Sequence, residues 1–202
     1  MLGGVAVKKE EILQAAILQY ANHGYQGATM KRIADEVGIK PASIYFFYEN
    51  KEKLFIAAFQ HILENHHHAM KKVLAENLEK PVAQIFPAML QGIVDHHTSN
   101  MAETSAYISL VTAPVPEIKN HIQSYLISFN EWMMDSLENA VCKDYPAIEP
   151  ADVDQIIKQY VLLGNGIFWG INLYDAAYLK EQVELAEQIF HSLFHQLDRQ
   201  YN

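Results

Sequence analysis

Apolar residues recur along most of the chain at the three- and four-residue spacing of an amphipathic helix. Prolines and glycines gather between these segments, where helices commonly begin or end. The pattern predicts nine helices, over Lys8–His23, Met30–Val37, Pro41–Phe47, Lys51–Asn77, Val82–Thr98, Met101–Thr112, Glu117–Cys142, Ala151–Tyr174 and Lys180–Gln200.

One short segment, Tyr107–Thr112, would also fit a strand. No other segment alternates apolar and polar residues with period two, so a strand here would have no partner. We therefore interpret it as a short buried helix and expect an all-α protein.

Composition narrows the class of protein. The chain has 202 residues, of which 50% are hydrophobic, so it can bury a sizeable core and is not mainly disordered. The single Cys142 excludes an internal disulfide framework and a four-cysteine zinc site. The apolar stretch over residues 160–171 is interrupted by Asn165 and is too short for a membrane span, and no signal peptide is visible. We expect a soluble, cytoplasmic protein.

Two short helices near the amino terminus are predicted with clear boundaries. Thr29 is a good N-cap, Gly38 is a good residue to end that helix, and Pro41 suits the first turn of the next helix. Two short helices joined by a glycine-containing turn form a helix-turn-helix, whose second helix can enter the roughly 12 Å wide major groove of DNA. Lys8–His23 would complete a three-helix core.

These residues resemble the TetR-type family of bacterial transcriptional regulators. The resemblance rests on residues 12–16, Gly24-Tyr25, 29–34, 37–39, and above all Ile44-Tyr-Phe-Phe-Tyr48 followed by Lys51-Glu-Lys-Leu-Phe55. It implies a helix-turn-helix DNA-binding domain, placed at residues 1–55, and a larger helical effector-binding and dimerisation domain, placed at residues 56–202.

The resemblance also implies DNA contacts. Thr29, Tyr45 and Lys51 would contact phosphates, whereas base edges would be faced by Lys40, Ala42, Ser43 and Phe46. The family often has His where this chain has Phe46, which could touch the methyl group of thymine.

Charge is distributed unevenly. The net charge is −9, yet residues 1–55 hold seven basic and six acidic residues, so the negative charge lies in the remainder.

The last two predicted helices favour a homodimer that buries four helices around a twofold axis. The final helix has a broad apolar stripe, and the helix before it carries small glycines that permit close approach. The predicted interface is Gly164, Trp169, Ala186, Ile189, Phe190, Leu193, Phe194 and Leu197. The alternative is that these residues pack only within their own chain.

Methionine and aromatic side chains at helical spacing in the middle of the chain fit a pocket for a small, largely apolar effector, or plain core. The candidates are Phe86, Met89, Leu90, Ile93, Tyr107, Leu110, Phe129, Trp132, Met133 and Phe168.

The ten histidines raise an alternative from another class, a helical-bundle metal-dependent hydrolase with His and Glu ligands. His191 and His195 lie one helical turn apart, with Glu187 a turn earlier, but a solvated face is the better interpretation. The sequence holds no HExxH and no nucleophile motif. We therefore expect no enzyme, no metal and no cofactor. The expected function is that of a ligand-responsive repressor, released from a palindromic DNA operator by its effector.

Overall fold

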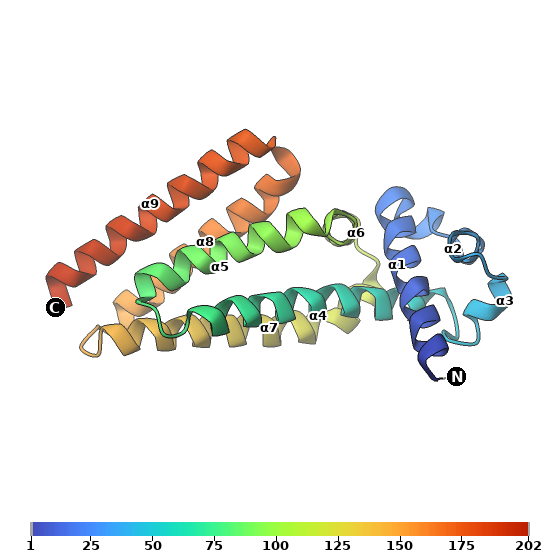
Figure 1. Ribbon diagram of the computed structural model, residues 1–202, viewed down its shortest axis with the longest axis horizontal. Helices are drawn as coiled ribbons and strands as arrows, with labels where there is room; N and C mark the ends of the chain where they lie inside the picture. The colour runs from blue at the N-terminus through green and yellow to red at the C-terminus, as the bar shows by residue number, and fades with distance from the viewer. Residues whose placement is uncertain (1, 202) are drawn as a thin grey trace. The chain divides into compact units, whose positions relative to one another are not determined.

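The protein is helical throughout the part of the chain that the structure describes (Figure 1). The computed structural model describes the backbone of residues 2–201 and the side chains of residues 8–201. Within these residues there is no strand, and no helix is long and apolar enough to cross a membrane. The helices are α1 (Leu2–Gly27), α2 (Met30–Val37), α3 (Pro41–Ile44), α4 (Lys51–Asn77), α5 (Val82–Ser99), α6 (Met101–Thr112), α7 (Pro116–Asp144), α8 (Pro150–Leu173) and α9 (Ala176–Tyr201).

The predicted all-α fold is confirmed, and the predicted bounds of α2, α4 and α6 agree with the structure. The segment that could have been a strand is the end of helix α6. Helix α1 is longer than predicted, and Gly24 introduces a kink within it, with φ 61° and ψ −179°.

Helix α3 ends earlier than predicted, at Ile44 rather than at Phe47. The following backbone closes as a tight turn, in which the amide groups of Phe47 and Tyr48 both donate to the Ile44 carbonyl, at 2.9 and 3.0 Å. Aromatic residues are only moderate helix formers, so the run of aromatic residues after Ile44 stabilises a longer helix only weakly.

Both predicted caps of α2 are confirmed. The Thr29 hydroxyl accepts a hydrogen bond from the Arg32 amide at 3.3 Å. Gly38 has the left-handed conformation, with φ 69°, and its amide donates to the Asp35 carbonyl at 3.2 Å. These caps fix the length of α2 and therefore the point at which the chain turns toward α3.

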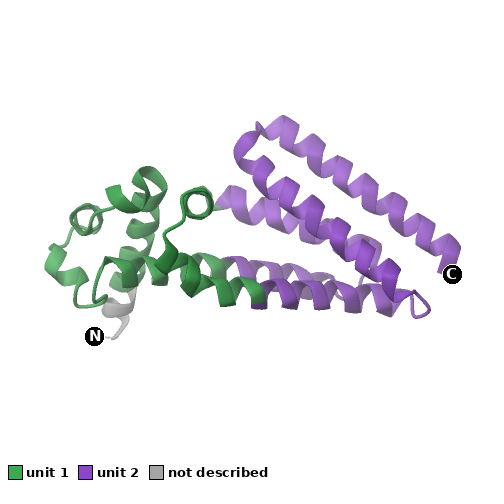
Figure 2. Ribbon diagram, turned by 180° about the vertical axis from the view of Figure 1, so that it is seen from behind, with its two compact units in different colours: residues 1–65, 100–127 green, residues 66–99, 128–202 purple. Residues whose placement is uncertain are grey.

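Contacts between residues divide the chain into two compact units (Figure 2). Unit 1 comprises residues 1–65 and 100–127, and unit 2 comprises residues 66–99 and 128–202. Helices α4 and α7 each contribute to both units. The predicted functional division at residues 55 and 56 is a different kind of boundary and stays a prediction.

Unit 1 is built around aromatic and aliphatic side chains of α1 and α4. Tyr20 of α1 lies edge-on to Phe55 and Phe59 of α4, with ring centroids 5.2 and 4.9 Å apart. Ile33 and Ile44 bring α2 and α3 into the same core, and α6 packs against α1. The helix-turn-helix is thereby fixed on a rigid base.

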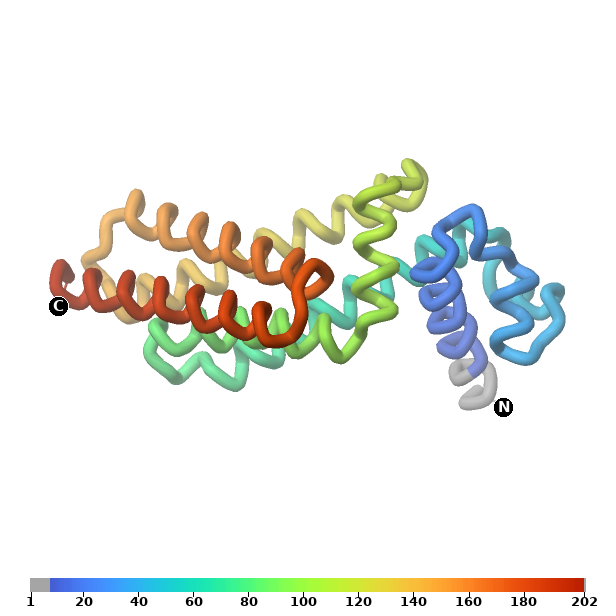
Figure 3. The backbone as a smooth tube through the Cα atoms, turned by 90° about the horizontal axis from the view of Figure 1, so that it is seen from above, coloured from blue at the N-terminus to red at the C-terminus, as the bar shows by residue number. Residues whose placement is uncertain are grey.

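Unit 2 is built around Phe86 of α5. Its ring makes edge contacts with Tyr160 of α8 and with Phe190 and Phe194 of α9, at centroid distances of 5.3, 5.2 and 5.2 Å. Helices α8 and α9 run side by side, and α5 packs against both of them (Figure 3). The buried face of α9 thus covers a core that belongs to its own chain.

Two glycine substitutions should have opposite effects on stability. An added Cβ meets nothing within 4 Å at Gly38 or at Gly166, so only the backbone differs between them. We expect Gly38→Ala to lower the free energy of unfolding by about 1 kcal/mol, because alanine is disfavoured in the left-handed region. Gly166→Ala, inside helix α8, should raise it by up to about 1 kcal/mol. Urea denaturation followed by circular dichroism would measure both changes, and equal effects would contradict this account.

Candidate nucleic-acid interface

The helix-turn-helix buries one side and exposes the other. Met30, Ile33 and Ala34 turn the apolar stripe of α2 inward, and Ile44 does the same for α3. Tyr48, just beyond α3, is also buried. These inner contacts hold α3 by its carboxyl-terminal end and leave the rest of that short helix in solvent.

The residues predicted to face base edges are all exposed. Lys40, Ala42 and Ser43 lie at the start of α3, and Phe46 lies in the turn that follows it. Phe46 is 81% exposed, the highest value among the exposed large hydrophobic side chains of the described residues. Its ring is supported from one side by Phe47, whose centroid is 5.3 Å away. The exposed ring gives this surface an apolar group beside the polar side chains of Lys40 and Ser43.

Two of the predicted phosphate contacts are also available. Tyr45 is 52% exposed, so its hydroxyl group lies at the same surface as the α3 residues. The Thr29 hydroxyl accepts the capping hydrogen bond of α2, which leaves its own proton free to be donated. Thr29 lies at the amino terminus of α2 and Tyr45 at the carboxyl-terminal end of α3, and a hydroxyl donor at either place can bond the oxygens of a phosphate group.

Lys51 has a role that the sequence did not indicate. Its ammonium group donates a hydrogen bond to the Tyr25 carbonyl and lies 4.4 Å from the centre of the Tyr25 ring. Burial lowers the pKa of Lys51 below its ordinary value. The side chain therefore connects the start of α4 to the last residues of α1, just after the kink at Gly24. One of its three protons is already used in this bond. The phosphate contact of Lys51 stays a prediction, and it would use the same ammonium group as the bond to Tyr25.

Sequence reasoning assigned no contact to Lys31 and Arg32, although both side chains are exposed in the first turn of α2. Their cationic groups lie at the amino-terminal, partly positive end of that helix. Periodicity indicated the exposure, and the observed cap at Thr29 places both residues in the first turn of α2.

The predicted effector-pocket residues divide between the two units. Tyr107 and Leu110 belong to unit 1, and the other eight belong to unit 2. Four of these eight are buried in the core of unit 2, namely Phe86, Met89, Leu90 and Ile93. The remaining four are partly buried and pack at its edge, namely Phe129, Trp132, Met133 and Phe168. The edge group is therefore the better place to look for a ligand.

The predicted dimer residues also divide. The core of unit 2 buries Ala186, Phe190, Phe194 and Leu197. A Cβ at Gly164 would contact Ile93 and Leu90 of the same chain, at 3.6 and 3.8 Å. The interface prediction narrows to Trp169, Ile189 and Leu193, because these three keep exposed surface.

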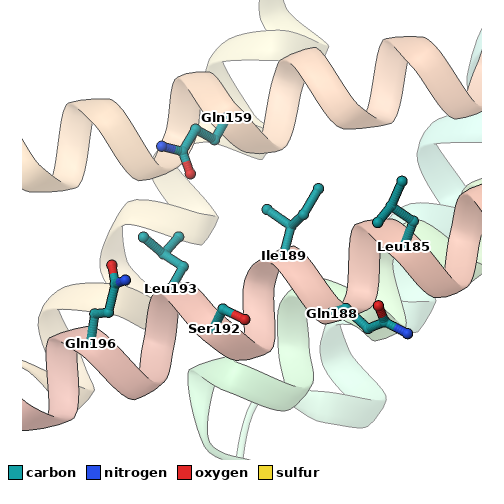
Figure 4. A pocket seen from close by; sticks show the side chains of 7 residues that line it. All are labelled: Gln159, Leu185, Gln188, Ile189, Ser192, Leu193 and Gln196. Atoms are coloured by element: carbon teal, nitrogen blue, oxygen red, sulfur yellow. The ribbon is translucent and has the colours of Figure 1, made fainter.

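Two exposed leucines extend this apolar surface beyond the predicted residues. Leu162 of α8 is 72% exposed and Leu185 of α9 is 50% exposed. Leu185 and Ile189 line a groove together with Gln159 of α8 (Figure 4). The remaining lining residues are Gln188, Ser192, Leu193 and Gln196. The helical phase of Leu185 differs from that of the buried stripe, which is the signal that could have found this residue.

The metal-site alternative gains nothing from the geometry. His191 and His195 are exposed on α9. Among the described residues, no group of three or more His, Cys, Asp or Glu side chains is placed to hold a metal ion.

The structural role of Lys51 can be measured apart from any DNA. Lys51→Met keeps an apolar stem and removes the ammonium donor, so we expect the free energy of unfolding to fall by about 1 kcal/mol. Lys53→Met is the matched control, because Lys53 lies two residues away with an exposed side chain. If urea denaturation gives the same result for both variants, the contact with Tyr25 contributes nothing measurable.

Comparison with known proteins agrees with this geometry. Residues 12–58 match the family model described as bacterial regulatory proteins, tetR family. The HTH-type transcriptional repressor AcnR of Corynebacterium diphtheriae is 34% identical over 73 residues, 36% of each chain. The biofilm operon icaADBC negative transcriptional regulator IcaR of Staphylococcus epidermidis is 40% identical over 47 residues, 23% of this chain and 25% of IcaR. The matched part of the chain thus spans about a third or less of these relatives.

Solved structures match over nearly the whole chain. A putative transcriptional regulator from Pseudomonas aeruginosa superposes with a TM-score of 0.75 at 15% identity, covering 96% of this chain and 93% of the other. The fatty acid degradation regulator FadR of Bacillus halodurans gives a TM-score of 0.67 at 19% identity, with coverage of 91% and 94%. At this identity the likeness concerns the fold. The hydrolase alternative has no support among these matches. Residues 12–58 are of the TetR type by sequence, and the chain shares its fold with these solved structures.

Proposed function

We propose that this chain is a homodimeric DNA-binding transcriptional regulator that acts as a repressor and is released from its operator by a small effector. The observation that carries the proposal is the exposed surface of α3 and the turn after it, where Phe46 stands in water beside Lys40, Ser43 and Tyr45. The chemistry required is binding, with no catalytic step. The protein would act in the bacterial cytoplasm, because the DNA that it binds lies there.

Base reading would come from the residues that α3 leaves exposed. Lys40 and Ser43 carry hydrogen-bonding groups of the kind that recognise base edges in the major groove. Ala42 and Phe46 have none, and their surfaces fit the methyl group of thymine. This combination favours an operator with thymines at the half-site positions that Phe46 reaches.

Phosphate contacts would fix the position of α3 in the groove. Thr29 and Tyr45 offer hydroxyl donors, and Lys51 offers the two protons that its bond to Tyr25 leaves over. Such contacts set the register of the protein on the duplex and carry no sequence information.

Dimerisation would use the exposed apolar side chains of α8 and α9. Leu162, Trp169, Leu185 and Ile189 are exposed large hydrophobic residues on these two helices. Pairing of α8 and α9 with the same helices of a second copy would remove this surface from water and form a four-helix interface. A twofold dimer implies a palindromic operator, with half-sites separated by whole turns of the duplex, about 34–36 Å or a multiple.

Release by an effector would be a shift between two states of the protein. An effector that binds one state more tightly moves the population toward it, and DNA does the opposite. The partly buried aromatic residues Phe129, Trp132 and Phe168 are the proposed walls of its site in unit 2. Helix α4 would carry the change, since it contributes to both units.

Selection of duplexes from a random DNA pool tests DNA binding and Phe46 together. We expect enrichment of a palindrome, and no enrichment would contradict the proposal. Replacing thymine by uracil in the enriched duplex removes one methyl group at a time. At the position that Phe46 contacts, loss of the methyl group should weaken binding about fourfold. This corresponds to ~0.8 kcal/mol for one buried methyl group.

Phe46→Ala should bind the thymine and uracil duplexes equally well. A gel-shift titration measures the four affinities that form this cycle. If the variant keeps the full preference for thymine, another residue reads the methyl group and the assignment of Phe46 is wrong.

The dimer surface can be tested by adding charge. Leu185→Glu combined with Ile189→Glu should shift the protein from dimer to monomer in sedimentation velocity runs, because two carboxylates would have to be buried at the interface. Ile127→Glu is the control, because Ile127 is an exposed hydrophobic residue of α7, outside α8 and α9. Equal dimer content in the two proteins would place the interface elsewhere.

A further inference from the structure

Three imidazole rings meet in unit 2. His66 of α4 lies 4.9 Å from His97 and 5.1 Å from His96, measured between ring centroids. His96 and His97 of α5 are 5.0 Å apart. The three rings thus form a nearly equilateral triangle, with residues that are about thirty positions apart in the sequence brought together by the packing of unit 2.

Aromatic rings surround this triangle. Phe129 of α7 lies 5.0 Å from His66, and Phe168 of α8 lies 4.8 Å from His97. The Nδ1 atom of His66 is buried and has no hydrogen-bond partner among the described residues. A buried nitrogen without a partner destabilises the folded state, because the hydrogen bond that it made to water in the unfolded chain is not replaced.

The titratable groups around His66 all carry positive charge when they are protonated. On α5 they are His96 and His97, and on α4 itself the nearest is His67, which is influenced in turn by Lys71. Helices α7 and α8 present the neutral rings of Phe129 and Phe168. A positive charge on one imidazole is therefore disfavoured, both by positive charge on the neighbouring groups and by the apolar rings of Phe129 and Phe168.

We propose that the His66, His96 and His97 cluster is a proton-operated switch: the packed form of unit 2 holds the three imidazoles neutral, and in acid they take up protons as the packing of α4 on α5 opens. A proton is a ligand that needs no cavity, which suits a cluster in which neighbouring rings already touch. Two protonated rings 5 Å apart repel each other, and this repulsion separates the helices that carry them.

Burial and the neighbouring imidazoles both lower the pKa values of these histidines. Together they lower the pKa of His66 well below its ordinary value, and they lower that of His97 to about 4. Burial also lowers the pKa of His96. Because the pKa values are lower in the folded protein than in the unfolded chain, the unfolded chain binds more protons between pH 6.5 and about 4. Stability is therefore complete above pH 6.5 and falls as the pH drops through this window.

The effect on DNA rests on the function proposed above. Helix α4 begins at Lys51, beside the helix-turn-helix, and reaches His66 without interruption. Loss of packing around His66 releases the part of α4 that unit 2 holds, so the two recognition segments of a dimer lose their fixed spacing. The switch would make the regulator leave its operator when the surrounding pH falls.

NMR titration of the histidine rings in the unmodified protein is the first test. We expect the rings of His66 and His97 to stay neutral at pH 5.5, where an imidazole with the ordinary pKa is largely protonated. If all ten histidines titrate one by one near pH 6.5 with the fold intact, the proposal is overturned. This measurement needs no variant.

The second test compares stabilities at pH 7.5, 6.0 and 5.0. Each neutral imidazole of the cluster should lower the folding equilibrium constant about tenfold per pH unit below pH 6. His66→Phe keeps an aromatic ring and removes one titrating group, so its loss of stability between pH 6 and pH 5 should be about tenfold smaller. His68→Phe is the matched control, exposed on the same helix, and should behave like the unmodified protein. Equal slopes for all three proteins would refute the proposal.

The third test separates the switch from the proposed function. Binding to the selected duplex at pH 7.5 tests the function, and the ratio of affinities at pH 7.5 and 5.5 tests the switch. We expect His66→Phe to retain at least tenfold more of its affinity at pH 5.5 than His68→Phe does. If both variants lose affinity equally, the acid response does not come from this cluster, whereas failure of binding at pH 7.5 contradicts the function and leaves the NMR result to decide on the proton uptake.

Discussion

Helix α4 imposes the constraint on which the rest of the structure depends, because one uninterrupted helix supplies side chains to two separate cores. Its first half gives Phe55 and Phe59 to the aromatic cluster around Tyr20, and its second half gives Met70 and Leu74 to unit 2. Neither core is complete without it. The two cores therefore share one helix, so a substitution in either half of α4 changes an element that both units use.

The same constraint explains why α3 can be so short. A four-residue helix has almost no stability of its own, so its position has to come from its surroundings. Ile44 and Tyr48 supply that position by burial, and the bond from Lys51 to the Tyr25 carbonyl fixes the adjacent turn to the start of α4. The outer side chains of Lys40, Ser43 and Phe46 stay exposed, and under the proposed function they are the ones that face the bases.

Sequence predicted most of the helices and the exposed face of α3, because periodicity and capping are local properties. It failed where the answer depends on tertiary contacts. The apolar stripe of α9 predicted that one face of this helix is buried. It did not predict whether Phe190 and Phe194 are buried by their own chain or by a second copy. The ring contacts with Phe86 of α5 show that their own chain buries them. The contact between Lys51 and Tyr25, and the meeting of His66 with His97, join residues too far apart in sequence for any spacing rule to reveal.

Charge limits the ways in which the proposed regulator could hold DNA. The chain carries a net charge of −9, and its first 55 residues have a surplus of only one basic residue, so the long-range field does not draw a duplex in. The affinity must come from short-range contacts. In the proposed complex, Phe46 would do more than read sequence, since moving its exposed ring from water against a base would supply binding free energy that salt does not screen. An acidic regulator with an apolar reading residue should accordingly depend less on ionic strength than one that relies on many lysine and arginine contacts to phosphate.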